Sequence, residues 1–323
     1  MTGTTSPGDG PIRVRVHAMT FEAEGVLSVE LRRPDGAELP AYAPGAHIDL
    51  HLPNGITRSY SLAGDPDLRD RYVVGVGLDA KSRGGSSYVH GKLRVGDLID
   101  IEAPRNHFPL VEDAEKVVFI AGGIGVTPML CMARRLTKLG RPFEFHYAVR
   151  SRDRAAFLTE LTELGIDVAL HVDAEAGRPA HVAGMLAGHP AGTHFYCCGP
   201  AGMLTAFEEA AAGVDDAFVH VEYFTPKAIE TAGADTAFTV ELAKSGRSLE
   251  IPADRSILAV LADAGVAVQS SCEDGICGTC EVAVLDGTPD HRDSVLTRAE
   301  QESNRTMMIC VSRCKGAKLV LDL

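Results

Sequence analysis

Three cysteines within nine residues place the strongest constraint on what this chain can fold into. They lie in the stretch SSCEDGICGTC as Cys272, Cys277 and Cys280, and a fourth, Cys310, follows after 29 intervening residues. Zinc ribbons usually show two C-x2-C pairs, and a thioredoxin-like C-x-x-C motif needs no third or fourth cysteine. The C-x4-C-x2-C…C series is the plant-type 2Fe-2S spacing, in which four thiolates hold two irons. We therefore predict such a cluster, with zinc or structural thiols as the alternatives.

Glycines inside the cysteine loop support this prediction. Gly275 and Gly278 allow the backbone to fold closely around a cluster and to turn its N–H groups toward the sulfurs. The hydroxyls of Ser270 and Ser271 can add hydrogen bonds to the same site.

Two further cysteines have to be weighed against the four. Cys314 follows Cys310 by four residues and is a rival fourth ligand. We favour Cys310, because its spacing matches the plant type and the apolar MMI before it is expected to hold a strand near the cluster. Cys131 lies in an apolar helical pattern, which predicts a place in the core.

Charge and hydropathy exclude some classes of partner. The 323 residues contain 31 Lys and Arg against 44 Asp and Glu, which argues against binding to nucleic acid phosphates. The N-terminal stretch MTGTTSPGDGPIRVRV has no apolar signal region. The most apolar stretch, residues 117–133, is short for a membrane span and contains three Gly and a Pro, so we predict strand, loop and helix there. We expect a cytoplasmic protein without membrane association, where clustered cysteines bind metal more often than they form disulfides.

The hydrophobic pattern divides the chain into three parts. Residues 10–111 show short alternating runs separated by turn residues, which predict an antiparallel barrel or sandwich. Residues 112–226 alternate between strand-like and helix-like segments, which predict a parallel, doubly wound sheet. After a predicted linker at 227–235, residues 236–323 begin with a hairpin that turns at Ser245 and Gly246. A helix capped by Asp254 and ended by Gly265 is expected next.

A glycine-rich turn in the second part indicates a nucleotide site. AGGIGVTPML, residues 121–130, is not the G-x-G-x-x-G fingerprint. Its glycines still permit a tight turn and close backbone approach, while Thr127 is expected to cap the following helix and Pro128 suits its first turn. The positive end of that helix would then face a phosphate.

With a barrel and a nucleotide domain in front of the cysteine series, the chain resembles the phthalate dioxygenase reductase family, which includes the reductases of vanillate demethylase systems. The resemblance covers nearly the whole chain in the same domain order. It implies a β-grasp ferredoxin domain at 236–323, an FMN-binding barrel at 10–111 and an NAD(P)-binding domain at 112–226. It also implies hydride transfer from NADH to FMN, followed by single-electron transfer through the cluster to a Rieske-type oxygenase. A cytochrome P450 as acceptor, or a redox-sensing role, are the alternatives, and we expect a monomer.

The resemblance also implies which residues bind the flavin. In the RSYS motif of the family, the Arg lies near the flavin phosphate and the Tyr lies against the flavin ring. A separate loop cradles the phosphate. One backbone stretch borders the ring, and an aromatic residue stacks on it. The corresponding residues here are Arg58, Ser59, Tyr60 and Ser61; Arg83, Gly84, Gly85, Ser86 and Ser87; Val74, Gly75 and Val76; and Phe224.

For the nicotinamide coenzyme, the resemblance implies two loops at the end of the sheet, a cysteine beside the nicotinamide and a nearby carboxylate. These are Gly122, Gly123, Ile124, Gly125, Thr127 and Pro128; Cys198, Gly199, Pro200 and Met203; and Glu222. Arg150, Arg152 and Arg154 follow the second strand of this domain, where arginines can receive the 2′-phosphate of NADPH. Because the family includes NADH users with basic residues here, we favour NADH and leave NADPH open.

The electron acceptor is expected to dock over the cysteine loop. Glu273 and Asp274 lie inside that loop and are candidates for steering a basic partner protein. An ordinary solvated acidic turn would explain them equally well.

Overall fold

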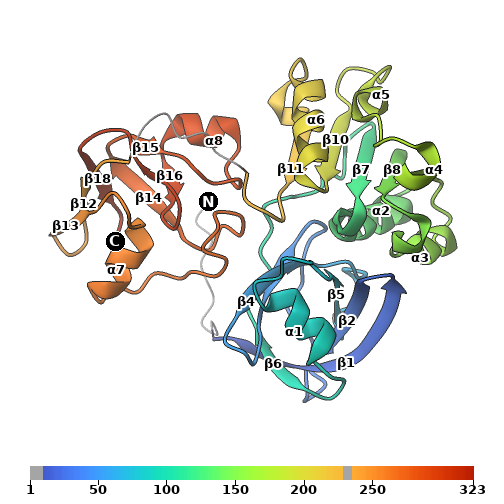
Figure 1. Cartoon of the computed structure of the whole chain (residues 1–323), viewed down its shortest axis with the longest axis horizontal. Coiled ribbons are helices and arrows are strands. Elements are labelled where there is room, and N and C mark those ends of the chain that lie inside the picture. Colours follow the sequence, from blue (N-terminus) through green and yellow to red (C-terminus); the bar gives the residue numbers. More distant parts are fainter. Residues whose placement is uncertain (1–9, 228–234) are drawn as a thin grey trace. The chain divides into compact units, whose positions relative to one another are not determined.

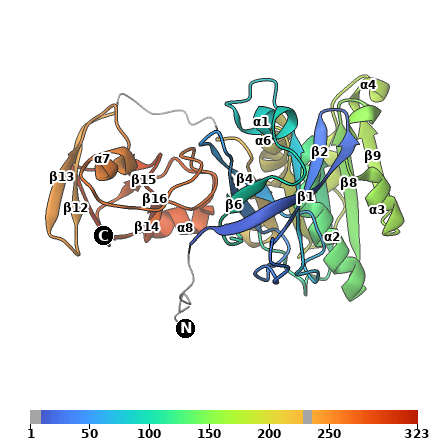
Figure 2. The same cartoon turned by 90° about the horizontal axis from the view of Figure 1, so that it is seen from below.

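The computed structural model describes residues 10–227 and 235–323 of the chain. The protein folds into two compact units, and the division falls between Val221 and Glu222. The first unit contains a six-stranded and a five-stranded sheet, and the second contains a five-stranded sheet and a two-stranded one (Figures 1 and 2). Most of the predicted linker, residues 228–234, lies outside the described residues. The three-domain boundaries proposed above stay a prediction.

The first part of unit 1 is the expected antiparallel barrel. Its strands are ordered β4-β3-β6-β1-β2-β5, and a bridge between Leu62 and Val74 joins the two edges of that order. Helix α1 (Gly85–Gly91) lies over the middle of the barrel strands in Figure 1 and at one end of the barrel in Figure 2. The strands are β1 (Ile12–Ala23), β2 (Val26–Arg32), β3 (His47–His51), β4 (Thr57–Ser61), β5 (Tyr72–Gly77) and β6 (Leu98–Ile101).

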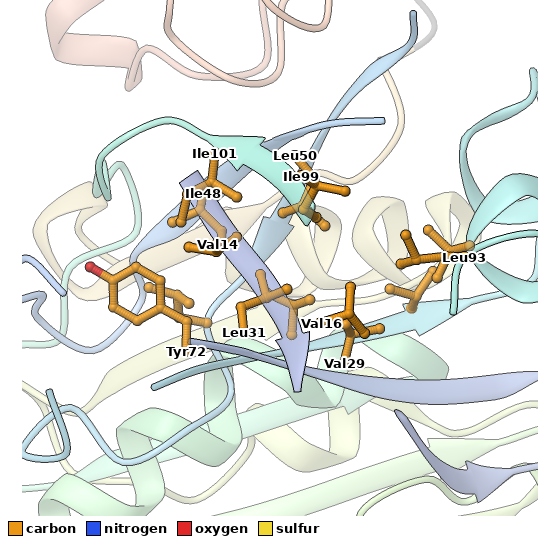
Figure 3. Close-up of a cluster of buried hydrophobic side chains, with 14 of the residues drawn as sticks. Val14, Val16, Val29, Leu31, Ile48, Leu50, Tyr72, Leu93, Ile99 and Ile101 are labelled. Atoms are coloured by element: carbon orange, nitrogen blue, oxygen red, sulfur yellow. The ribbon is translucent and has the colours of Figure 1, made fainter. Parts of the chain in front are cut away.

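Alternating side chains fill the interior of this barrel, as the period-2 pattern predicts. Figure 3 shows them meeting from different strands, together with a residue that follows α1. All are almost completely buried, and each contributes roughly 1.5–3 kcal/mol of hydrophobic free energy on full burial. They include Val14, Val16, Val29, Leu31, Ile48, Leu50, Tyr72, Leu93, Ile99 and Ile101.

The second part of unit 1 is the expected α/β layer. Its sheet order is β11-β10-β7-β8-β9, and β10, β7, β8 and β9 pair in parallel. The strands are β7 (Val117–Gly122), β8 (Phe143–Val149), β9 (Val168–Val172), β10 (His194–Cys198) and β11 (Val219–Glu222). The helices are α2 (Val126–Leu139), α3 (Leu158–Glu163), α4 (Asp173–Ala176), α5 (Val182–Leu186) and α6 (Ala201–Ala211), with 3-10 turns η1 (Gly123–Gly125), η2 (Arg152–Arg154) and η3 (Asp216–Phe218).

Barrel and α/β layer are joined within unit 1 by specific contacts. The Tyr196 hydroxyl of β10 donates to Pro109 O at 3.1 Å and accepts from Val111 N at 2.9 Å. Lys138 of α2 reaches across to Asp65, with both carboxylate oxygens at 2.8 Å. Tyr196 thus holds the segment that connects the two parts, and Lys138 links the two parts directly. Both parts therefore belong to one unit.

Unit 2 has the mixed sheet and packed helix of a β-grasp domain. The order is β13-β12-β18-β14-β16, with β12 and β18 parallel and the other neighbouring strands antiparallel. The elements are β12 (Phe238–Leu242), β13 (Arg247–Ile251), α7 (Ile257–Asp263), β14 (Glu281–Asp286), β15 (Pro289–Asp290), α8 (Arg298–Ser303), β16 (Thr306–Met308), β17 (Arg313–Cys314) and β18 (Lys318–Leu321). Among the described residues, no helix combines the length and apolar character that crossing a bilayer requires.

Two predicted helix caps are wrong. Ser256, not Asp254, caps α7, because its hydroxyl accepts the N–H of Ala259 at 3.2 Å. Thr127 lies inside α2, after the cap residue Gly125, and its hydroxyl donates backward to Ile124 O at 3.0 Å. In both helices the N-cap residue lies two positions away from the predicted one. Which residue caps a helix depends on the direction in which the preceding chain enters its first turn. The segment SRGGSS, expected as a loop, also enters helix α1 at Gly85.

We predict that Arg105→Ala destabilises the barrel by about 3–5 kcal/mol. The Asp49 carboxylate is fully buried and accepts from Arg105 Nη2 and Ser59 Oγ, each at 2.5 Å. Removing Arg105 takes away a cation that pairs with this buried charge. The free energy of unfolding is to be measured by chemical denaturation of the full chain.

The matched control is Arg13→Ala, which breaks an ion pair in the same barrel. Arg13 and Asp100 lie 2.5 Å apart, but their side chains are 59% and 34% exposed. Solvent screens such a pair, so its loss should cost less than about 1 kcal/mol. Equal losses in the two variants would contradict the role given to burial.

Candidate functional site

Two loops at the carboxyl end of the parallel sheet touch through their backbones. β7 and β10 are neighbours, and their last residues lead into the loops AGGIG and CGPAG. A Cβ placed on Gly125 would lie 2.1 Å from Cys198 O, and one placed on Gly122 would lie 3.1 Å from the Cα of Gly199. No larger residue fits at Gly125 without separating the loops. The structure therefore brings the two predicted coenzyme loops together.

Side chains of the second loop cover the first. Around Gly122, the Cδ of Pro200 and the Sδ of Met203 lie 2.6 Å and 2.7 Å from an ideal Cβ position. Cys198 is fully buried at the end of β10, beside the first loop. Gly123 and Ile124 form the turn η1 that leads into α2, and Pro128 lies in the first turn of α2. All the residues predicted for these two loops thus occupy one place in the fold.

The two predicted flavin motifs also meet. A Cβ on Gly85, at the start of α1, would lie 2.6 Å from Arg58 Cγ on β4. The side chain of Asn54 donates to Gly84 O at 3.1 Å and ties the hairpin before β4 to the same turn. Arg58 therefore lies directly over the beginning of α1, as a phosphate-binding pair requires.

Ser82 organises that turn, and sequence reasoning left it outside the candidate residues. Its hydroxyl oxygen accepts the N–H groups of Gly84 and Ser87, both at 3.2 Å, and the hydroxyl of Ser86 approaches it to 3.1 Å. Several donors thus converge on one point, which is the pattern of an anion-binding nest. The S-x-G-x-S spacing could have indicated this turn, because a Ser hydroxyl can hydrogen-bond a backbone N–H group about two residues further along the chain.

Residues of the RSYS strand divide between two faces. In the register of β3 with β4, Tyr60 lies opposite Ile48 and Ser59 lies opposite Asp49. Burial raises the pKa of Tyr60 to about 12, so its phenol remains a neutral hydrogen-bond donor. The Ser59 hydroxyl is already bonded to Asp49, while Arg58 shares the face of Tyr60 by strand alternation.

Strand β5 brings the flavin and coenzyme motifs into contact. A Cβ on Gly75 would lie 2.5 Å from Thr127 Cγ2 and 3.0 Å from the ring of Phe157. Val74 and Val76 on either side are fully buried. Phe157 was not predicted from the sequence: it has a positive φ of 59°, which is rare for an aromatic residue, and only its three-dimensional neighbours reveal it.

The basic residues after β8 are partly neutralised. Arg152 makes a bidentate pair with Glu175 of α4, with nitrogen–oxygen distances of 2.9 and 2.8 Å. The hydrogen bond between them raises the pKa of Arg152 and lowers that of Glu175. Arg150 and Arg154 flank this pair in sequence. Glu175 was not a predicted site residue, because it lies 23 positions from its partner.

Glu222 and Phe224 lie at the beginning of unit 2. Both are half-buried, at the end of β11 and just after it. Their predicted roles beside the nicotinamide and the flavin stay predictions.

In unit 2, strand pairing brings the distant cysteine to the cysteine loop. β14 begins directly after Cys280, and β16 ends two residues before Cys310. The two strands pair antiparallel with Glu281 opposite Met308, and Ile309 N donates to Cys280 O at 3.3 Å. The apolar run before Cys310 is fully buried, as expected.

The four thiols associate in two pairs. The neighbouring thiol of Cys272 lowers the pKa of Cys277, and the neighbouring thiol of Cys310 lowers the pKa of Cys280. No three His, Cys, Asp or Glu side chains among residues 10–227 and 235–323 are placed to hold a single metal ion. Two pairs of thiols match the ligand set of two bridged irons, each of which takes two thiolates.

Loop details fit a bound cluster. Gly275 and Gly278 have positive φ values of 70° and 74°, and the N–H of Asp274 donates to the Cys272 sulfur at 3.3 Å. The Ser271 hydroxyl is buried without a hydrogen-bond partner among the described residues, which leaves it free for a cluster sulfur. Cys314, the rival ligand, lies in β17 and accepts Gly316 N at 3.2 Å.

The surface beside the cluster loop is hollowed. A cavity of ≈ 700 Å³ is lined by α7 and the following turn, with Glu273 and Cys310 in its wall. Glu273 is exposed and has a positive φ of 56°, whereas Asp274 is half-buried. Of the two predicted steering carboxylates, Glu273 is the more accessible.

Comparison with known sequences gives a consistent result. Residues 240–315 match the family described as 2Fe-2S iron-sulfur cluster binding domain. The chain is 51% identical to phenoxybenzoate dioxygenase subunit beta of Ectopseudomonas oleovorans, covering 97% of this chain and 98% of that one. It is 44% identical to vanillate O-demethylase oxidoreductase of a Pseudomonas species, with 97% and 100% covered. With phthalate dioxygenase reductase of Burkholderia cepacia it shares 42%, with 99% and 100% covered.

Solved structures give the same fold. The structure of phthalate dioxygenase reductase, described as modular for electron transfer from pyridine nucleotides to 2Fe-2S, matches with a TM-score of 0.71 at 40% identity, covering 97% of this chain and 98% of that one. An intact type IV self-sufficient cytochrome P450 monooxygenase matches with a TM-score of 0.90 at 39% identity. The match covers 100% of this chain but 43% of that longer protein.

We predict that Gly125→Ala weakens coenzyme binding on the order of 100-fold, because a shift of about 1 Å in a binding loop has effects of that size. The added Cβ would meet Cys198 O at 2.1 Å and force the two loops apart. The dissociation constant for NADH is to be measured by titration. Gly213→Ala is the control, since nothing lies within 4 Å of its Cβ position and it lies outside both loops; wild-type affinity in Gly125→Ala would show that the contact is dispensable.

Proposed function

The chain belongs to the family of phthalate dioxygenase reductase and vanillate O-demethylase oxidoreductase, and on that premise we propose how its residues carry out the reaction. The protein is an oxidoreductase, the reductase component of a multicomponent oxygenase system. Its redox groups are NADH, a flavin and a 2Fe-2S cluster. We propose that the flavin is FMN and that the oxygenase is of the Rieske type.

One observation carries the assignment: β5 contacts α2 at Gly75 and Thr127, so the flavin motif and the coenzyme motif form one site. Hydride transfer requires the two reacting rings to stack closely, with water excluded. The flavin motif and the coenzyme motif share one site, and the same chain contains the domain with four thiols. This combination supports a series of electron carriers more directly than a redox sensor, because a sensor needs no efficient entry for hydride.

Residues of unit 1 have distinct roles in the proposal. Arg58 would neutralise the FMN phosphate beside the turn that Ser82 organises at the start of α1. The neutral phenol of Tyr60 lies against the ring. The N-terminal end of α2 faces the coenzyme pyrophosphate, whose negative charge suits the partial positive charge of a helix start.

Residues of unit 2 hold the cluster. Cys272, Cys277, Cys280 and Cys310 are its four ligands, and the N–H of Asp274 donates to the Cys272 sulfur. When bound, flavin accepts electrons as a pair and releases them singly, which is the form that an iron–sulfur cluster accepts. Cys310 contributes to the wall of the cavity beside α7, and Glu273 in the same wall favours a basic partner surface.

The acceptor could differ while the reductase stays the same. A Rieske oxygenase is supported by the names of the relatives, which are reductases of dioxygenase and demethylase systems. A cytochrome P450 is the second candidate, supported by the likeness to a self-sufficient P450. Reconstitution of substrate turnover with each purified oxygenase tests the choice, and turnover with the P450 alone would reverse it.

We predict that Cys272→Ser abolishes electron transfer to an external acceptor and leaves hydride transfer to the flavin intact. Serine cannot replace a soft thiolate ligand well, but it changes nothing in unit 1. Anaerobic stopped-flow absorbance measures flavin reduction by NADH, and cytochrome c reduction serves as the acceptor assay. Cys314→Ser is the control, expected to behave as wild type. Loss of flavin reduction in Cys272→Ser would refute this division of labour.

We also predict that the protein prefers NADH, and that Glu175→Gln raises kcat/KM for NADPH about fivefold, the range of an exposed ion pair. Glu175 forms an ion pair with the Arg152 guanidinium and repels the 2′-phosphate of NADPH. The substitution therefore makes the guanidinium available to that phosphate. Initial rates with both coenzymes give the ratio. Glu163→Gln removes the same charge from α3 and should leave the ratio unchanged; a wild-type preference for NADPH would overturn the coenzyme assignment.

A further inference from the structure

A segment remote in sequence packs behind the cysteine loop. An ideal Cβ on Gly275 would lie 3.2 Å from the Cα of Asp293, and Ser294 N donates to Gly275 O at 2.9 Å. Gly275 lies between the predicted ligands Cys272 and Cys277. Residues 293 and 294 therefore form the outer wall of the cluster cage.

The side chain of Asp293 is fully buried in that wall. Its carboxylate accepts the N–H groups of Val295 at 3.1 Å and Leu296 at 2.8 Å. The hydroxyl of Ser312, two residues after Cys310, approaches it to 3.5 Å. The carboxylate thus lies between the two segments that supply the cluster ligands.

The pKa of the Asp293 carboxyl is held below its usual range, which favours the ionised form. Burial opposes its ionisation, but the adjacent His291 ring and the N–H groups of Leu296 and Val295 outweigh burial and lower the pKa of Asp293. The His291 ring is itself buried, with Nδ1 at 3.8 Å from the carboxylate.

The nearest arginine does not neutralise Asp293. Arg292 turns its guanidinium to Asp235, at 2.5 and 3.0 Å, and to Asp290, at 2.8 Å. Within the part of the chain that the structure describes, no Lys or Arg forms an ion pair with Asp293. Among the described residues its ion-pairing partner is the His291 ring, with Nδ1 at 3.8 Å, so no permanently charged cation faces the carboxylate in the low-dielectric shell of the cage, where charges act strongly on one another.

We propose that Asp293 sets the reduction potential of the 2Fe-2S cluster by placing this buried negative charge behind its ligands. The inference rests on the proposed function, because it requires the cluster. A negative charge opposes the arrival of an electron and lowers the potential, and surrounding charge is among the factors that tune such clusters. A lower potential increases the driving force for transfer to the acceptor protein.

The test is the midpoint potential of the cluster in Asp293→Asn, measured by anaerobic spectroelectrochemical titration of the full-length protein. Asparagine keeps the shape and one acceptor oxygen but removes the charge. We expect reduction to become about tenfold more favourable, which is a rise of about 59 mV for a one-electron couple. An unchanged potential with an intact cluster spectrum would overturn the proposal.

Two further variants separate charge from structure. Asp290→Asn removes the same charge from the same segment, but Asp290 is 33% exposed and paired with Arg292, so its shift should be much smaller. Asp293→Glu keeps the charge and should keep the wild-type potential. If the Asp293→Asn variant does not retain the cluster, the Asp293→Glu variant decides between the two roles. A wild-type potential in Asp293→Glu supports the proposal. A shifted potential or a lost cluster in Asp293→Glu assigns Asp293 a purely structural role.

Failure of this inference differs from failure of the proposed function. Purified wild-type protein without iron and acid-labile sulfide would refute the proposed function itself. Wild-type protein with a normal cluster and an Asp293→Asn variant of equal potential would refute only the role of Asp293.

Discussion

Each proposed redox site depends on backbone segments that approach too closely for a Cβ atom. Gly75 admits Thr127 beside the flavin motif, Gly125 admits the Cys198 carbonyl between the coenzyme loops, and Gly275 admits Val311 beside the cluster ligands. A Cβ at these positions would lie 2.1–2.6 Å from its neighbour. Since electron and hydride transfer both demand short distances, the fold uses glycine wherever two functional segments must meet.

Pairing of strands explains how distant residues become one site. The coenzyme loops meet because β7 and β10 are parallel neighbours whose carboxyl ends share an edge, the usual place for ligands in such sheets. The cluster ligands meet because β14 and β16 pair antiparallel, with Cys280 before one strand and Cys310 after the other. Parallel pairing in unit 1 and antiparallel pairing in unit 2 thus each bring together residues that are distant in the sequence.

Charges in the protein fall into two groups with different consequences. Arg152 and Glu175 are mostly exposed, so their pairing acts on coenzyme choice and little on the fold. Asp49 and Asp293 are fully buried. The first is matched by Arg105 and stabilises the barrel. The second faces the His291 ring and no Arg or Lys among the described residues, which in our proposal leaves its field to act on the cluster.

By itself the sequence determined the fold class, the cluster spacing and the two glycine-rich coenzyme loops, because each of these is encoded in residues close together along the chain. The caps of α2 and α7 were misplaced, since a cap depends on the approach of the preceding chain. Ser82, Phe157, Glu175 and Asp293 came only from the tertiary structure. Their roles arise from partners brought near by folding, and burial, distance and missing counter-charges are properties of that arrangement and not of any local pattern.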